Sequence, residues 1–359
     1  MMQKAPNNFF LRLKTGAALL VSAAIFAAVF EAAVSFLMLR GLTPGAPDAL
    51  LAFFRGYYWA SPYRHYLQFD PECAVYDARV FYRLKTGACF HSGARFRNHY
   101  SINSLGTRDD ELSLVAPEIV TLGDSHTMGW GVAQEDSYPQ LLERRTGRRV
   151  LNMGVSSFGT ARELEFLMRA DLRGLRYLVI QYNDNDLEEN LAYLSRKRRP
   201  GLRPEEDWKS LSEQVGSSGY FPGAHLARMA VFARENFKGR RKTPEAGPVT
   251  HAWAFMSVLG KFLDRPELRG VKVLVFSVNN SHGGGSAPRF RLDGALKPLL
   301  SAGKFSRFAG RVTVLSAGAE LDEPACRHLI DNHINAEGHR RAAGALLPYL
   351  AGSGAQGGG

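Results

Sequence analysis

The sequence predicts an α/β fold with a parallel sheet, preceded by one membrane-spanning helix. Between residues 116 and 350, short apolar runs alternate with helical patterns, the order that produces parallel strands joined by crossover helices. Nearer the N-terminus, residues 16–39 form a long apolar run that only Ser22, Glu31 and Ser35 interrupt. Of the 359 residues, 45% are apolar and 22% charged, an ordinary composition for a globular protein that argues against global disorder.

The apolar run over residues 16–39 has the length of a transmembrane helix, which needs about 20 residues. Lys4, Arg12 and Lys14 precede it, so the positive-inside rule places the N-terminus in the cytoplasm. We therefore expect residues 1–40 to form a cytoplasmic end and a single-pass anchor in the inner (cytoplasmic) membrane, with the remaining chain in the periplasm or exterior. A cleaved signal peptide is the alternative, but its apolar region would be shorter and would end at a small-residue cleavage site.

Glu31 is unexpected inside this span, because one carboxylate deep in a bilayer costs about 3 kcal/mol. Three explanations stay open at this point. The carboxylate is protonated, it pairs with a partner helix, or it lies near the membrane interface.

The formal net charge of +11 favours contact with anionic surfaces such as lipid head groups, acidic polysaccharide or nucleic acid. Two basic runs, at residues 196–199 and 238–242, are typical of solvated loops. No zinc-finger spacing, RNA-recognition signature or aromatic-and-basic stripe accompanies them. We therefore expect no nucleic-acid partner.

The three cysteines, Cys73, Cys89 and Cys326, contain no C-x-x-C pair, so the sequence does not predict a zinc site or a thioredoxin-like motif. In an oxidising compartment Cys73 and Cys89 can form a disulfide across a short loop. Cys326 would then be unpaired.

The chain divides into regions of different character. Residues 41–115 are rich in Tyr, Phe, Arg and His without clean periodicity, and predict an irregular extension packed on the main domain. Residues 116–350 predict that domain, interrupted by a basic, proline-containing insertion at 188–250 that we expect to cap the site. Residues 351–359 predict a flexible tail because they are rich in glycine.

Within the main domain, apolar runs predict five strands, at residues 118–122, 149–153, 177–182, 271–277 and 311–315. Periodicity and capping residues predict helices at residues 137–146, 160–172, 224–237 and 340–350.

The segment Gly123-Asp124-Ser125-His126 follows the first predicted strand directly. In parallel sheets, sites form beyond the carboxyl ends of the strands. A hydroxyl nucleophile needs exposure at a tight turn, a nearby base and donors for an oxyanion. Taken alone, Gly123-Asp124-Ser125 would more simply indicate that Asp124 or Ser125 caps the following helix.

A second candidate segment, residues 331–339, precedes the last predicted helix. Its His333 lies in a loop, where a base could turn toward the strand ends. The simpler interpretation of His333 alone is a surface residue beside a helix that Asn335 caps, although Gly338 occupies the position where a capping box needs Glu or Gln.

Together these segments resemble the SGNH (GDSL-like) hydrolase and acyltransferase family, in its membrane-anchored form. Four blocks match in the right order: residues 123–126 with 129–132, residues 152–155 with Gly159, residues 183–186, and residues 333–339. Residues 103–108 also resemble the stretch that precedes the first block in membrane-anchored members.

The resemblance implies a three-layer, flavodoxin-like domain with a five-stranded parallel sheet. It implies that Ser125 is the nucleophile and His333 its base. It also implies an oxyanion hole made by the amides of Ser125 and Gly154 and the side-chain amide of Asn185.

Two departures from the family pattern leave alternatives open. Asn183 stands where the third block usually has glycine, so it rivals Asn185 as the side-chain donor. The acidic residue usually lies three positions before the histidine, and that position is Ile330. Asp331 can orient His333 if residues 331–333 are extended, since both side chains then lie on one face; otherwise the site is a Ser–His dyad.

The resemblance implies a serine esterase that acts through an acyl-enzyme on O-acyl esters, foremost O-acetyl esters, of an envelope carbohydrate or lipid. An O-acyltransferase that modifies an exported glycan is the first alternative, because it would use the same site. A catalytically silent binding protein with this fold is the second. We expect no cofactor and no metal.

Overall fold

The computed structural model describes residues 8–196, 203–216, 219–237, 246–278 and 292–351. Residues 197–199 and 238–242 of the basic runs lie outside these ranges, as does the tail from residue 352. The expected solvated loops and flexible tail are therefore not addressed by the structure.

The helices are α1 (Asn8–Phe36), α2 (Asp48–Tyr58), α3 (Ser125–Met128), α4 (Tyr138–Thr146), α5 (Thr160–Leu167), α6 (Asp186–Ser195), α7 (Glu205–Gly216), α8 (Ala224–Phe237), α9 (Pro248–Leu263), α10 (Leu292–Ser301), α11 (Gly318–Leu321) and α12 (Ala336–Leu350). The strands are β1 (Ala74–Asp77), β2 (Phe81–Leu84), β3 (Gly87–Ser92), β4 (Arg97–Ile102), β5 (Ile119–Leu122), β6 (Val150–Asn152), β7 (Tyr177–Tyr182), β8 (Lys272–Ser277) and β9 (Val312–Val314).

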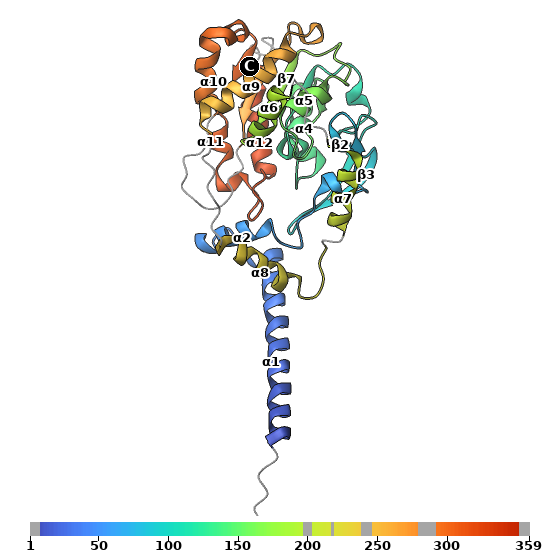
Figure 1. Ribbon diagram of the computed structural model, residues 1–359. Coiled ribbons are helices and arrows are strands. Elements are labelled where there is room, and N and C mark those ends of the chain that lie inside the picture. The colour runs from blue at the N-terminus through green and yellow to red at the C-terminus, as the bar shows by residue number, and fades with distance from the viewer. Residues whose placement is uncertain (1–7, 197–202, 217–218, 238–245, 279–291, 352–359) are drawn as a thin grey trace, which may run out of the picture.

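The central sheet confirms the predicted fold class. Its five strands are all parallel and lie in the order β6-β5-β7-β8-β9, the doubly wound order of flavodoxin-like sheets. Successive side chains point to opposite faces: Leu178 and Ile180 enter a core with α5, α9 and α10, whereas Val179 enters a core with α4 and α12. The result is a three-layer domain (Figure 1).

Two predicted helices have different ends in the structure. The helix predicted over 160–172 ends at Leu167, because the amides of Arg169 and Ala170 form tighter i→i−3 bonds of 3.0 Å. The last helix begins four residues earlier than predicted, at Ala336. Asn335 caps it, its side-chain oxygen accepting from the amides of Glu337 and Gly338 at 2.9 and 3.1 Å.

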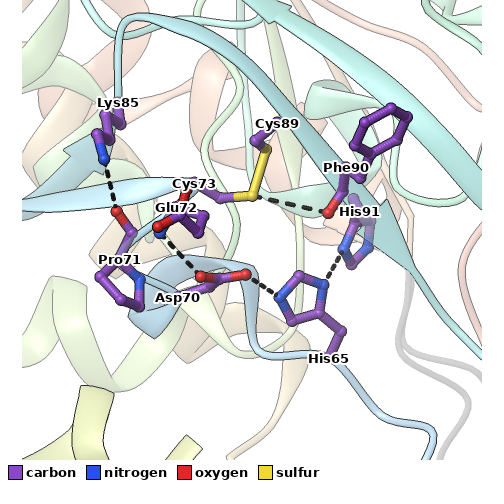
Figure 2. Close-up of a disulfide and its surroundings, with 9 residues drawn as sticks. All are labelled: His65, Asp70, Pro71, Glu72, Cys73, Lys85, Cys89, Phe90 and His91. Atoms are coloured by element: carbon purple, nitrogen blue, oxygen red, sulfur yellow. Dashed lines mark hydrogen bonds and ion pairs between the residues drawn. A yellow bond between two sulfur atoms is a disulfide. The ribbon is translucent and has the colours of Figure 1, made fainter. Parts of the chain in front are cut away.

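The extension over residues 41–115 is more regular than predicted. It contains helix α2 and two antiparallel hairpins, β1–β2 and β3–β4. A disulfide between Cys73 and Cys89 joins the two hairpins, so the pairing that the sequence left open is formed (Figure 2). Cys326 is a buried free thiol. Strands of four to six residues leave little periodicity in the sequence, so these hairpins had no clear local signal.

Removing this disulfide is expected to lower the free energy of unfolding by about 3 kcal/mol, the usual value for a loop of this length. The test compares thermal or denaturant unfolding of the full chain in detergent for wild type and the Cys73→Ala/Cys89→Ala variant. Cys326→Ala, which removes a thiol but no bond, is the control. Equal stability of wild type with and without reductant would contradict the prediction.

Helix α1 and the turn after it are long and apolar enough to span a membrane. Within Arg12–Gly41 the most apolar 18-residue window has a mean hydropathy of 2.2, and only 11% of that window is buried; among the described residues no other helix meets these criteria. The helix projects from the domain as a stalk (Figure 1). Its C-terminal end is held by Arg95, whose guanidinium donates to the carbonyl oxygens of Leu37, Met38 and Leu42 at 2.8–2.9 Å.

Glu31 is paired with another helix of the same chain. Its carboxylate accepts hydrogen bonds from the amides of His225 and Leu226, at 3.1 and 3.2 Å, and its side chain is buried. These amides belong to the first turn of α8, where a carboxylate satisfies unpaired N–H groups and the positive end of the helix dipole. Capping of α8 thus explains why the carboxylate of Glu31 lies in the apolar run.

Candidate active site

The chain presents Ser125 at a tight turn where β5 ends. Gly123 has φ +153°, and a Cβ at this position would lie 2.1 Å from Thr127 Oγ1 and 2.5 Å from Gln181 Oε1. Only glycine fits there. Asp124 caps α3 by accepting from the amide of His126 at 2.9 Å. Ser125 is therefore the first helical residue, at the carboxyl edge of the sheet.

Three predicted residues come together in one hydrogen-bonded chain. Ser125 Oγ lies 2.7 Å from His333 Nε2, although 208 positions separate them in the sequence. His333 Nδ1 bonds to Asp331 Oδ1, and the amide of His333 donates to the same oxygen at 3.1 Å. All three side chains are buried, with 7%, 5% and 3% exposure for Ser125, His333 and Asp331. The structure thus has the geometry of a Ser–His–Asp triad, not of a dyad.

Trp130 supports this triad and was not foreseen from the sequence. Its indole Nε1 donates to Asp331 Oδ2 at 2.9 Å, and its ring stacks on His333 with centroids 4.7 Å apart and planes at 16°. Gly129, with φ +88°, turns the chain so that the indole reaches these partners. The only sequence signal for Trp130 was the Gly-Trp-Gly run in the first block. That run could not identify its partner, because Asp331 lies 201 positions away.

The environment keeps Asp331 ionised. Burial alone would raise the pKa of this carboxyl, but the charge and hydrogen bonds of His333 lower the pKa well below its ordinary value. An ionised Asp331 can hold the imidazole in the tautomer that places a proton on Nδ1 and stabilise an imidazolium.

A cavity of about 160 Å³ opens onto Ser125. Its lining from the main domain is Asp124, Ser125, Trp130, Ser156, Ser157, Asn185 and His333, and its lining from the extension is Trp59, Arg64, Tyr66 and Gln68. The described residues of the insertion at 188–250 do not line it. The expectation that the insertion caps the site therefore stays a prediction for its remaining residues. Among the described residues, those of the cavity lining that come from outside the main domain belong to the extension, and α7 packs behind them, with Trp208 Nε1 donating to Gln68 O at 3.0 Å.

The predicted oxyanion donors differ in their placement. Asn185 is exposed at the cavity, whereas its rival Asn183 is buried and donates to Asp124 Oδ2 at 2.8 Å. The amide of Gly154 donates to Asn152 Oδ1 at 3.0 Å and does not line the cavity. A Cβ on Gly154 would lie 2.3 Å from the amide nitrogen of Met128, so glycine is required there for packing against α3. The geometry argues against Gly154 as a donor.

Ser157 occupies the position at the cavity that was expected for Gly154. Its backbone has φ +61°, a left-handed conformation that is uncommon for a residue with a side chain. Its hydroxyl accepts from Gln68 Nε2 at 3.3 Å, and its carbonyl oxygen accepts from Arg162 at 2.6 Å. Strained backbone of this kind concentrates at functional sites.

Arg108 holds the turn that carries Trp130. The guanidinium is fully buried and donates to the carbonyl oxygens of Met128, Gly129 and Val132 at 2.6–3.1 Å. The neighbouring Asp109 accepts from the amide of Asn152 at 2.8 Å. The segment over 103–108, matched in the sequence without an assigned role, together with the following Asp109 thus connects the first two blocks.

Comparisons with known proteins add these findings. No protein-family model and no curated protein matches the chain. Among solved structures, a G-D-S-L family lipolytic protein from Desulfitobacterium hafniense DCB-2 is 12% identical, covers 64% of this chain and 98% of its own, and has a TM-score of 0.37. An extracellular lipase from Streptomyces rimosus is 18% identical, with 66% and 98% coverage and a TM-score of 0.33. These values are too low to transfer a function, so the site is interpreted from its own geometry.

Proposed function

We propose that the chain is an SGNH-type serine hydrolase that cleaves ester bonds through an acyl-enzyme on Ser125. The observation that carries this proposal is the hydrogen-bonded chain Ser125–His333–Asp331 at the mouth of a cavity. A nucleophile bonded to a base that a third group orients is the arrangement that covalent catalysis requires.

The residues support the following steps. Ser125 Oγ attacks the ester carbonyl while His333 Nε2 accepts its proton. His333 then gives that proton to the departing alkoxide, and water releases the acyl group in a second step with the same base. Asp331 stabilises the imidazolium, and Trp130 fixes Asp331. The amides of Ser125 and Ser157 and the side chain of Asn185 would hold the oxyanion.

Replacing Asn185 by Ala is expected to lower kcat about 10²–10³-fold with a small change in KM, since an oxyanion donor acts mainly in the transition state. Initial rates on a p-nitrophenyl ester measure this. Glu188→Ala, an exposed change one turn along α6, is the control. A wild-type rate in Asn185→Ala would exclude Asn185 from the oxyanion hole.

We further propose that the chain is a single-pass protein of the inner membrane, with its catalytic domain on the periplasmic side. The basic residues before the span and the Cys73–Cys89 disulfide, which suits an oxidising compartment, support this orientation. The substrate would be an acylated envelope carbohydrate or lipid, and the net charge of +11 is suited to an acidic surface. Transfer to a glycan instead of water would use the same acyl-enzyme.

The proposal is tested by turnover of p-nitrophenyl acetate, octanoate and dodecanoate by the full chain in detergent. We expect ester cleavage that prior treatment with a fluorophosphonate abolishes. A folded protein that cleaves none of these esters would favour the silent binding protein.

A further inference from the structure

Two amphipathic helices lie where the membrane span meets the domain. Helices α2 and α8 cross the upper end of α1 in Figure 1, and α8 packs against α1. The contact at Glu31 fixes the depth of α8, because Glu31 lies five residues before Phe36, about 8 Å along the axis at 1.5 Å per residue. The start of α8 is therefore at the outer end of the span, the level of the lipid head groups and upper acyl chains.

An apolar cluster makes this region continuous with the catalytic loop. It contains Val34, Met38, Leu42, Leu51, Phe54, Tyr57, Tyr58, Ala94 and Ile330. Ile330 directly precedes Asp331, and Arg55 of α2 donates to the carbonyl oxygen of Leu329 at 2.9 Å. The end of the span, α2 and the triad loop are thus packed against one another.

A groove of about 900 Å³ lies between α2 and α8. Small residues, Ala52 and Gly56 on α2 and Ala233 on α8, leave space that the rings of Phe53 and Phe232 border. Its volume is at the upper end of the range for small-molecule sites, about 300–1,000 Å³. Bulky side chains exposed on the same helices and the loop before α8 include Phe53, Phe221, Leu226, Val231 and Phe237. Such exposure is costly in water and is expected of helices that lie in a membrane interface.

The groove and the catalytic cavity share two lining residues, Trp59 and Arg64. The Arg64 guanidinium stacks over the Trp59 ring at 3.9 Å and over the Tyr66 ring at 4.0 Å. Its Nη1 donates to Tyr66 Oη at 2.6 Å, while its buried Nε has no acceptor among the described residues. Arg64 thus lines both the apolar groove and the catalytic cavity, and its cationic guanidinium is suited to a polar oxygen at the head of an apolar chain.

We propose that the α2–α8 groove receives an acyl chain of a bilayer lipid and presents the ester of that chain, past Trp59 and Arg64, to Ser125. This inference rests on the proposed function and narrows its substrate class to membrane lipid esters. Continuity with the membrane span identifies the occupant as a bilayer lipid, and the shared lining residues connect it to the chemistry. The bond cleaved is the acyl ester, with the proton path through His333 described above.

The experiment places a bulky side chain in the groove. Ala233→Trp and Ala52→Trp, on opposite walls, are compared with Ala230→Trp, an exposed position on α8 outside the groove. The ratio of kcat/KM for p-nitrophenyl dodecanoate to that for p-nitrophenyl acetate is expected to fall at least about tenfold in both groove variants, since one methylene more or less in a hydrophobic pocket already changes kcat/KM about 10–200-fold. The ratio should be unchanged in Ala230→Trp. Unchanged ratios in both groove variants would overturn the proposal.

A second readout does not depend on ester cleavage. The full chain in nanodiscs is photolabelled with phosphatidylcholine that carries a diazirine in its acyl chain, and labelled peptides are identified. We expect labelling around Met229 and Phe232 in wild type and Ala230→Trp, and its loss in the groove variants. Labelling without any ester turnover would reject the proposed hydrolase but keep the lipid site. Ester turnover without groove labelling would reject the lipid site alone.

Discussion

Ser125→Ala is expected to lower ester turnover about 10⁶-fold, since removing the nucleophile of such a triad removes nearly all covalent catalysis. The geometric reason is that Ser125 Oγ, 2.7 Å from His333 Nε2, is the hydroxyl at the cavity that is bonded to a base. Rates on p-nitrophenyl octanoate with the full chain in detergent measure the effect.

The effect should come from chemistry and not from folding. Ser125 occupies the first position of a short helix that Asp124 caps, so its loss leaves the cap and the turn at Gly123 in place. Ser210→Ala, an exposed serine on α7, is the matched control and should have the wild-type rate. A residual rate within tenfold of wild type in a folded Ser125→Ala protein would rule out Ser125 as the nucleophile.

Asp331→Asn is expected to lower kcat about 10⁴-fold while the fold is kept. An amide in this position no longer stabilises the imidazolium, and it favours the tautomer of His333 that cannot accept a proton from Ser125. Trp130→Phe, which removes only the bond from the indole to Asp331, should have a smaller effect, about 10–100-fold, as expected for a hydrogen bond to a charged group. Equal rates for wild type and Asp331→Asn would indicate a Ser–His dyad.

The same variant should change the dependence of stability on pH. The pKa of Asp331 is lower in the folded chain than its ordinary value of about 3.9. Its contribution to the free energy of unfolding is therefore fully present above that pH and is lost as the pH falls toward the folded value. Wild type should lose more stability than Asp331→Asn between about pH 4 and pH 2. Unfolding of the two proteins by denaturant at each pH measures this difference, and parallel curves would contradict it.

The sequence predicted the sheet from local signals, and it predicted the pair Ser125 and His333 from the ordered set of segments, since each segment alone has a simpler interpretation. Apolar runs of strand length marked all five strands, and Ser125 and His333 each lie in a short segment next to a strand end or a helix start. The role of Asp331 stayed open, since it depends on whether residues 331–333 are extended. Only the fold shows that both side chains reach one another.

Other parts of the site depend on contacts between distant segments. Gly154 and Ser157 differ by three positions, but the turn after β6 buries the first against α3 and brings the second to the cavity. Trp130 and Arg108 act through partners that no local pattern identifies. The groove arises where α2 and α8 meet near the end of α1, and 165 residues separate the end of α2 from the start of α8.

Whether Ser125 is an activated nucleophile can be measured by mass spectrometry of the full chain after treatment with a fluorophosphonate. We expect one adduct per chain, located on Ser125, absent in Ser125→Ala and formed far more slowly in His333→Ala. A folded wild-type protein without an adduct, or an adduct that persists in Ser125→Ala, would contradict this expectation.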